Sequence, residues 1–483
     1  MSEMQYDEWM SESDSVLWHI ERDPMLRSTI TSVWLLDSSP NRKRLDAMVD
    51  RTVANLPRMH QRVIDAQPGV SPPRWEDDPY FDPTYHYQWV RLPGTKPGMR
   101  EILEYAQHLA ARAFDKDRPL WELTVVEKLP KKRAAFIMKV HHAIADGLGM
   151  VQMLEHMVDL EPDPPTDDEP SVVTEVTKPT PATWTPPAAR PIAHRISSEA
   201  KTGVRLGKAS LRTASEILRD PRGTVEQLRR TTESIARVIT PAATPLSPLM
   251  TERSTHARLD TLSVPFKRMK AAANSQGGSL NDAFVATTID ALDRYHQAFD
   301  TPCTELRMNM PISVRSDDTA NLSDNQFVPA RMVIPVSEAN AAQRLIDIKA
   351  LLRDVRDEPA LPHVGDISGV ISRLGPAASV SLLGSMMKGV DITTTNVPGP
   401  PFPVWMAGAR VDEFYAFGPL AGSAVNIALF TYDGAAHLGI TTDPAAVSDP
   451  DFFVQCMQEA LDETLALADE DEDENENETP PAQ

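Results

Sequence analysis

The sequence is poor in cysteine and has no long apolar run, and these absences exclude several classes of protein. Its 483 residues include only two cysteines, Cys303 and Cys456, which lie far apart. A disulfide framework and a cysteine-rich metal site are therefore excluded, and a reducing cytoplasm fits. No apolar run reaches the roughly 18 residues that a transmembrane helix needs. The acidic, polar N-terminus does not fit a secretory signal.

Positive charge is also scarce, because the formal net charge is −21. This balance argues against nucleic acid as the main partner. Residues 190–237 are an exception, with eleven Lys or Arg against five Asp or Glu, a local charge of +6. Two interpretations of this basic helical segment stay open: a solvated face, or a surface for anionic lipid headgroups. The last residues, ADEDEDENENETPPAQ, are expected to be a disordered acidic tail.

The chain is longer than one hydrophobic core usually supports, so two domains are predicted. Apolar residues at helical spacing predict helices within residues 44–63 and 99–114. Apolar segments on either side of PKKR predict a pair of strands, and GMVQMLEHMVDL predicts a helix after them. Residues 1–160 are therefore interpreted as an N-terminal α/β domain.

A change in composition separates this domain from a second one. Nine prolines in residues 161–191 predict an extended linker, because proline lacks the donor that ladders and helix interiors need. The linker and the basic segment together occupy residues 161–250, and the acidic tail occupies 469–483. Residues 251–468 predict a second α/β domain, with a helix after GGS in GGSLNDAFVATTIDALDRY and a hairpin with an Asp-Gly turn in SAVNIALFTYDGAAHLGITTD. A cleft between two such domains is a common ligand site.

The stretch AAFIMKVHHAIADGLGM, residues 134–150, ends an apolar strand in two adjacent histidines. Neighbouring side chains in a strand point to opposite faces, so one histidine is expected to face a site and the other to support the backbone. Asp146 is expected to hold an ion pair that shapes the turn, and Gly147 to tolerate a positive φ. A neutral imidazole can take a proton from an alcohol or amine near neutral pH. No Gly-x-Ser-x-Gly elbow occurs, so a serine acyl-enzyme of that type is not supported.

Three other interpretations of this motif compete with general base catalysis. A metal site is disfavoured, because His-His-x3-Asp lacks the i, i+4 histidine pair of helical zinc motifs. A buried structural histidine at a strand end and a binding module that has lost its chemistry stay open at this level, since a single short motif is weak evidence.

The motif HHAIADG resembles the HHxxxDG signature of coenzyme A-dependent acyltransferases, which include chloramphenicol acetyltransferase and peptide-synthetase condensation domains. The rest of the chain looks most like the bacterial wax ester synthase/diacylglycerol acyltransferase family. The segments that carry this resemblance fall in the family's order from about residue 11 to 466: MSESDSVLWHIERDP, PLWELTVVE, SLNDAFVA, NMPISVR, TNVPGP and VNIALFTYDG.

The resemblance implies an α/β fold of two chloramphenicol-acetyltransferase-like domains, with mixed sheets and a tunnel at their interface. It implies that acyl-CoA enters from one side and the acceptor from the other. His142 is implied as the general base, with His141 beside it. Asp146 is implied as a structural aspartate that pairs with an arginine, for which Arg315 is the candidate. The proline-rich linker, the acidic tail and LSDNQF depart from the family's pattern, but none of them touches the histidine motif.

Four further residues are candidates for substrate binding. Trp121 is expected to line the acyl channel or to be a core residue that begins a strand. Asn281 and Asp282 are interpreted as a helix N-cap pair, with direct substrate contact as the alternative. Asn396 lies in TNVPGPP, which is expected to leave its sheet because of its prolines. Its path is expected to run over the coenzyme A entrance, with a plain strand exit as the alternative.

The function expected from the resemblance is transfer of a long-chain acyl group from acyl-CoA to diacylglycerol or a fatty alcohol. No metal or redox cofactor is expected, because the thioester is already activated. Two alternatives stay open: transfer within the same superfamily to another alcohol, to an amine or from a carrier-bound donor, and a non-catalytic protein of lipid surfaces. A cytoplasmic protein, able to sit on the inner membrane or on lipid inclusions, fits all three. The sequence does not rank alcohol against diacylglycerol.

Overall fold

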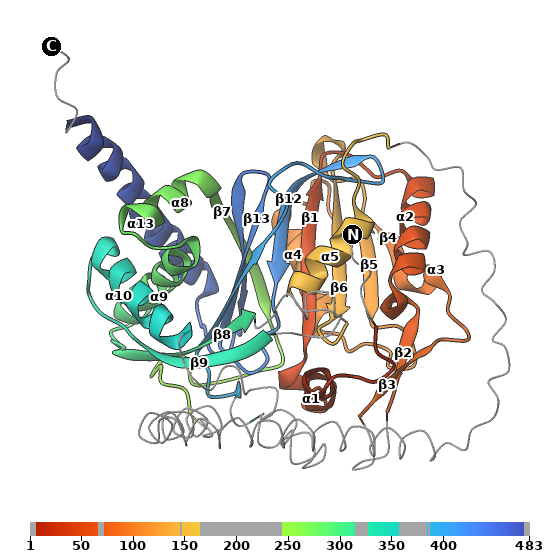
Figure 1. Cartoon of the computed structure of the whole chain (residues 1–483), viewed down its shortest axis with the longest axis horizontal. Helices are drawn as coiled ribbons and strands as arrows, with labels where there is room; N and C mark the ends of the chain where they lie inside the picture. The colour runs from red at the N-terminus through yellow and green to blue at the C-terminus, as the bar shows by residue number, and fades with distance from the viewer. Residues whose placement is uncertain are drawn as a thin grey trace, which may run out of the picture.

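The computed structural model describes residues 6–65, 72–144, 147–164, 244–313, 327–356, 384 and 387–477. Two six-stranded sheets lie beside each other, each with helices packed on it (Figure 1). The mixed α/β class predicted from the sequence is confirmed. The linker of residues 161–191 lies almost wholly outside the described residues, and the basic segment of residues 190–237 lies entirely outside them.

The first sheet has the order β11-β12-β1-β6-β5-β4. Its strands are β1 (Thr29–Leu36), β4 (Tyr87–Val90), β5 (Trp121–Val126), β6 (Ala134–His141), β11 (Trp405–Met406) and β12 (Ala409–Phe417). β5 and β6 form the predicted antiparallel pair, with Trp121 opposite Val140. β1 pairs with the other side of β6 and places Thr29 opposite His141. The strand that carries the histidines is therefore hydrogen-bonded on both edges.

Helices cover both faces of this sheet. They are α1 (Glu12–Ile20), α2 (Arg42–Asn55), α3 (Pro83–His86), α4 (Met99–Ala111) and α5 (Gly147–Met157), with short 3-10 turns η1 (Pro24–Leu26), η2 (Pro57–Met59) and η3 (Pro130–Lys132). A small separate sheet pairs β2 (Gln61–Ile64) with β3 (Arg74–Asp77). The helix predicted within residues 44–63 is α2, and it ends at Asn55 because the residue before Pro57 avoids the α region.

The second sheet has the order β7-β14-β13-β10-β8-β9. Its strands are β7 (Arg258–Pro265), β8 (Glu305–Ser313), β9 (Phe327–Pro335), β10 (Ile392–Pro398), β13 (Val425–Tyr432) and β14 (Ala435–Thr442). The predicted β13–β14 hairpin is confirmed, and its turn residues Asp433 and Gly434 both have positive φ, 42° and 81°. The helices that cover this sheet are α8 (Phe266–Ser275), α9 (Leu280–Ala298), α10 (Ala341–Arg356) and α13 (Pro450–Asn477) (Figure 1).

The sheets do not follow the sequence boundary between the two predicted domains. β11 and β12 come from the C-terminal half, yet β12 pairs with β1 and completes the first sheet. On its way β12 crosses close over β14, where a Cβ on Gly439 would lie 1.9 Å from the carbonyl oxygen of Ala416. The crossing therefore requires glycine at position 439. Through β12, the C-terminal half contributes a strand to the sheet of the N-terminal half.

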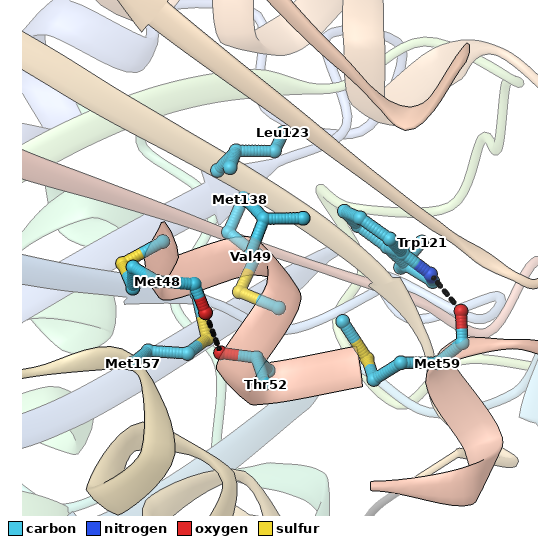
Figure 2. A pocket seen from close by; sticks show the side chains of 8 residues that line it. All are labelled: Met48, Val49, Thr52, Met59, Trp121, Leu123, Met138 and Met157. Atoms are coloured by element: carbon cyan, nitrogen blue, oxygen red, sulfur yellow. Dashed lines mark hydrogen bonds between the residues drawn. The ribbon is translucent and has the colours of Figure 1, made fainter. Parts of the chain in front are cut away.

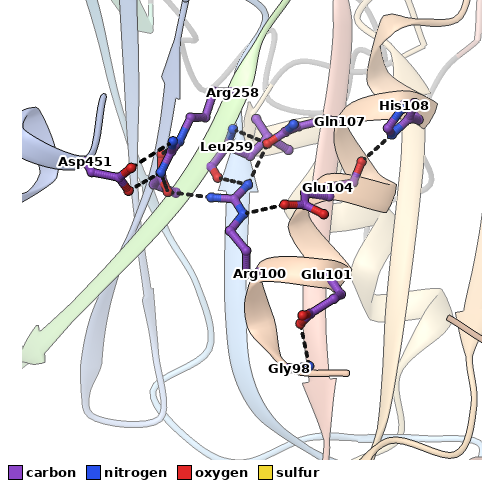
Figure 3. Close-up of polar contacts among 10 residues, drawn as sticks. Gly98, Arg100, Glu101, Glu104, Gln107, His108, Arg258, Leu259 and Asp451 are labelled. Atoms are coloured by element: carbon purple, nitrogen blue, oxygen red, sulfur yellow. Dashed lines mark hydrogen bonds and ion pairs between the residues drawn. The ribbon is translucent and has the colours of Figure 1, made fainter. Parts of the chain in front are cut away.

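A polar network also joins the halves (Figure 3). Arg100 of α4 donates to Asp260 Oδ1 at 2.7 Å and to the carbonyl oxygen of Leu259 at 3.0 Å, both on β7. The Leu259 N–H donates in turn to Gln107 Oε1 of α4 at 2.9 Å. Arg258 extends the network to Asp451 at the start of α13. α4 is thus fixed between the first sheet and β7.

The last helix extends into the segment that was predicted to be an acidic tail. α13 continues to Asn477, so residues 469–477 are helical and the expectation of disorder from residue 469 is not met there. Asp469 of α13 pairs with Arg268 of α8, so the first residue of this acidic segment is attached to a neighbouring helix. Residues 478–483 lie outside the described residues. No helix within the described ranges is long and apolar enough to cross a membrane.

Candidate active site

The first histidine of the motif is the last residue of β6 and is fully buried. Its ring is hydrogen-bonded at Nδ1 and faces a carboxylate at Nε2. The N–H of Ala143 donates to His141 Nδ1 at 3.0 Å, and Nε2 lies 3.1 Å from Glu21 Oε1. Trp18 and Phe114 pack edge-on against the ring, with centroids 5.8 and 6.1 Å away. His141 is therefore a rigid, enclosed part of the site.

Glu21 connects this ring to the backbone of the second histidine. Its Oε1 accepts a hydrogen bond from the Ser28 N–H at 2.9 Å, and the Ser28 carbonyl oxygen accepts one from the His142 N–H at 2.8 Å. Burial acts to raise the pKa of Glu21, but the contacts with His141 and with the Ser28 N–H hold this pKa below its ordinary value. The carboxylate is thus kept ionised by the groups that it organises.

The second histidine lies just past the strand, in the turn that leads towards α5, and its side chain is half-buried. Its greater exposure relative to His141 suits a group that must meet a substrate, but its catalytic role stays a prediction. Gly147 is the first residue of α5. Asp146 and Arg315 lie outside the described residues, so their predicted ion pair is not described.

A buried lysine on the same strand was not singled out from the sequence. Lys139 is fully buried, its Nζ lies 3.1 Å from Glu122 Oε1, and it sits 4.0 Å from the centroid of the Phe114 ring. Burial lowers the pKa of Lys139, while the nearby charge of Glu122 acts against that shift. A lysine inside the apolar run AAFIMKVHH is the signal that could have identified it. Glu21 lies in MSESDSVLWHIERDP, a segment that carries the family resemblance, but nothing in the sequence connects this residue with the distant histidine motif.

Trp121 begins β5 and belongs to the core, so it has the position expected for a buried tryptophan. Its Nε1 donates to the Met59 carbonyl oxygen at 2.7 Å, and its ring stacks on His86 with centroids 4.5 Å apart. It also borders a small apolar hollow between the first sheet and helices α2 and α5 (Figure 2). The lining residues are Met48, Val49, Thr52, Met59, Trp121, Leu123, Met138 and Met157.

The polar side-chain groups of the lining residues are both hydrogen-bonded. The Thr52 hydroxyl donates to the Met48 carbonyl oxygen at 2.7 Å, and the Trp121 Nε1–H donates to the Met59 carbonyl oxygen. Four of the eight lining residues are methionines, whose flexible thioethers adapt to different contents. The hollow lies within the first half of the fold, so the predicted tunnel between the halves stays a prediction.

The structure divides the predicted pair Asn281 and Asp282 into two roles. The N-cap of α9 is Ser279 and not Asn281, and Asp282 accepts from the Ser279 N–H at 2.8 Å, which completes a capping box. The interpretation of both residues as the cap was therefore wrong for Asn281. Asn281 Oδ1 instead accepts from Asn396 Nδ2 of β10 at 3.4 Å, and Asn281 Nδ2 lies 3.6 Å from the sulfur of Met310. Two predicted substrate-binding residues thus meet across separate elements.

Among the residues that the structure describes, no group of three or more His, Cys, Asp or Glu is arranged to hold a metal ion. The chemistry available at the motif is that of an imidazole beside a buried carboxylate.

Comparison with known families decides what this arrangement belongs to. The model of the wax ester synthase/diacylglycerol acyltransferase catalytic domain matches residues 10–284, and that of the family's C-terminal domain matches residues 323–464. The chain belongs to the wax ester synthase/diacylglycerol acyltransferase family. The resemblance seen in the sequence is confirmed, and the protein is an acyltransferase of this family.

Named relatives and solved structures agree with this membership. A Mycobacterium tuberculosis H37Rv protein, whose name places it provisionally among the diacylglycerol O-acyltransferases, is 32% identical over 94% of this chain and 91% of its own. The wax ester synthase/diacylglycerol acyltransferase of Marinobacter aquaeolei VT8 superposes with a TM-score of 0.60 at 19% identity, covering 95% of this chain and 99% of its own. The first condensation domain of the calcium-dependent antibiotic synthetase gives a TM-score of 0.59 at 15% identity, covering 96% and 97%. The last two likenesses show the shared fold.

Proposed function

We propose that this acyltransferase moves a long-chain acyl group from acyl-CoA to the hydroxyl of diacylglycerol or of a fatty alcohol, with His142 as the general base. The observation that carries the proposal is the unequal environment of the two histidines. His141 is sealed between Glu21 and Ala143, whereas His142 lies one residue further on, half-buried, with its backbone fixed to Ser28. The greater exposure of the second ring supports its assignment as the group that exchanges a proton with a substrate.

The proposed reaction needs no covalent enzyme intermediate. His142 takes the hydroxyl proton of the acceptor while the acceptor oxygen attacks the thioester carbonyl carbon. The C–O bond forms, the tetrahedral adduct collapses and the C–S bond breaks. The proton then passes from His142 to the leaving sulfur, which gives an ester and free coenzyme A. The thioester is already activated, so no metal or redox cofactor is required.

We further propose that the methionine-lined hollow receives the acyl chain. The hollow is about the size of a water molecule, so an acyl chain enters only when the flexible methionine side chains move aside. Its walls are apolar and its one hydroxyl is hydrogen-bonded, so a hydrocarbon would leave no polar group of the hollow unpaired, whereas a polar chain would leave its own groups unpaired. Its floor includes Met138, which lies on the same face of β6 as Val140, one residue before the motif. The helix that borders it, α5, starts at Gly147, the last residue of the motif. These positions connect the hollow with the proposed base.

The proposal is tested by incubating the purified protein with labelled palmitoyl-CoA and either hexadecanol or dioleoylglycerol. We expect labelled wax ester, labelled triacylglycerol or both, together with one free thiol for each ester formed. An active family member run in parallel provides the control. If that control works and this protein forms no ester with either acceptor, the proposed substrates are wrong.

A further inference from the structure

A carboxylate outside the histidine motif holds both histidines in place. Glu21 is the C-cap residue of α1, and its side chain is nine-tenths or more buried, with 6% exposed. Its Oε1 accepts from the Ser28 N–H and lies at hydrogen-bonding distance from His141 Nε2. Burying a carboxylate costs free energy unless it is paired, so these contacts fix the position of the Glu21 side chain.

We infer that Glu21 is a positioning residue for the acyl transfer proposed above, one that orients the histidine pair without touching the substrate. The inference rests on that proposed function. It assigns a role to a residue that lies 120 positions before His141 and that neither the motif nor its spacing indicates.

The ring of His141 shows the first part of this role. A backbone N–H can only donate, so the contact from Ala143 makes Nδ1 an acceptor. Neutral His141 therefore carries its proton on Nε2, the atom that faces Glu21. The ring lies between one backbone donor, which hydrogen-bonds Nδ1, and one carboxylate 3.1 Å from Nε2. Loss of the carboxylate would remove the acceptor that the buried Nε2–H faces.

The backbone shows the second part. Contacts run from His141 Nε2 to Glu21, from Glu21 to the Ser28 N–H, and from the Ser28 carbonyl oxygen to the His142 N–H. The peptide bond between the two histidines closes this circuit. Any displacement of the Glu21 carboxylate is therefore passed to His142 through Ser28, which is the residue directly before β1.

The same segment provides a matched control. Asp23 lies two residues after Glu21, and its carboxylate pairs with Lys388 of the C-terminal half and accepts from the Met25 N–H. Asp23 takes no part in the circuit of contacts that joins Glu21, Ser28 and the two histidines. Asp23→Asn therefore removes a charge from the same segment while it leaves the circuit intact.

The test compares Glu21→Ala, Glu21→Gln and Asp23→Asn in the full-length protein, with kcat, KM for acyl-CoA and thermal melting measured for each. A displacement of about 1 Å can cost 10²-fold in rate, so we expect Glu21→Ala to lose roughly 10- to 100-fold in kcat with KM little changed. Glu21→Gln keeps an oxygen acceptor of about half the strength, so its kcat should stay clearly above that of Glu21→Ala. Asp23→Asn should keep wild-type kcat. An unchanged kcat in folded Glu21→Ala, a loss confined to KM, or a Glu21→Gln variant as slow as Glu21→Ala would overturn the inference.

A second readout does not depend on turnover. The buried Nε2–H of His141 should give a slowly exchanging, downfield proton resonance, assigned by its absence in His141→Ala. We expect the resonance to persist in wild type and Asp23→Asn and to be lost in Glu21→Ala. If wild type makes no ester but shows this pattern, the proposed function fails while the role of Glu21 in holding His141 stands. If the resonance survives in Glu21→Ala, the positioning role is overturned whatever the activity.

Discussion

The His142 N–H donates to the carbonyl oxygen of Ser28 at 2.8 Å, so the turn that carries the proposed base is anchored to the start of β1. This bond joins two segments more than 110 residues apart, and it sits beside the Glu21 contact with His141. The motif is therefore held by the N-terminal segment as well as by its own strand. The predictions below test which of these contacts serve chemistry and which serve stability.

The hollow predicts a change in acyl-chain selectivity. Val49→Phe adds volume to a lining position of α2, so the ratio of palmitoyl-CoA to octanoyl-CoA turnover should fall about tenfold, within the range that one or two methylenes command in an apolar pocket. Val53→Phe is the matched control, because Val53 lies on the same helix and in the same core without bordering the hollow. Both variants should lose about 1–3 kcal/mol of stability from overpacking. Equal selectivity in the two variants would place the acyl chain elsewhere.

The contact between Asn281 and Asn396 predicts coupled effects on substrate binding. If the two amides act as one unit, Asn281→Ala and Asn396→Ala should each raise KM for acyl-CoA, and the double variant should be hardly worse than the more damaged single variant. A double-mutant cycle on kcat/KM measures this coupling. Strictly additive losses would show that the two side chains act separately, and unchanged KM in both single variants would exclude them from the binding site.

The depressed pKa of Glu21 predicts how its contribution to stability depends on pH. A carboxyl group with a lowered pKa in the folded state stabilises the protein above its unfolded pKa and loses that contribution as pH falls through the folded value. Wild type should therefore melt at a higher temperature than Glu21→Gln near neutral pH, and the difference should shrink progressively as the pH falls below about 4.5, the ordinary value for glutamate. Thermal melts of both proteins across this range provide the test. A difference that grows on acidification would mean that Glu21 is protonated in the fold.

Local signals in the sequence predicted the elements whose structure is decided locally. The Asp433-Gly434 turn fixes the β13–β14 hairpin because both residues accept positive φ, and PKKR separates β5 from β6. The capping pattern predicted the start of α9 correctly but assigned the N-cap to the wrong residue. Ser279 and Asn281 can both accept from the free N–H groups of the first turn, and Ser279 is the residue directly before the helix. In α2, the apolar spacing continued past the point where Pro57 stops the helix.

Long-range contacts were beyond this kind of inference. Nothing local in ARVDEFYAF shows that β12 joins the sheet of the other half. Its pairing with β1 depends on contacts with distant segments and on the close approach of β12 to β14 that Gly439 allows. Glu21 likewise lies in a segment that resembles the family, MSESDSVLWHIERDP, but only the fold shows that its carboxylate lies beside His141. The site was therefore predictable at its motif, while its supporting contacts required the structure.

The most direct test of the account measures turnover and melting of His142→Ala and His141→Ala with palmitoyl-CoA and the preferred acceptor. Loss of a general base typically costs about 10² to 10⁴ in rate, so His142→Ala should lose most of its kcat while its melting temperature stays close to wild type. His141→Ala should lose less kcat and more stability, because it empties a buried position, leaves the Ala143 N–H unpaired and removes the ring that faces Glu21. Near-normal turnover in His142→Ala, together with an inactive but fully folded His141→Ala, would contradict the assignment of the base.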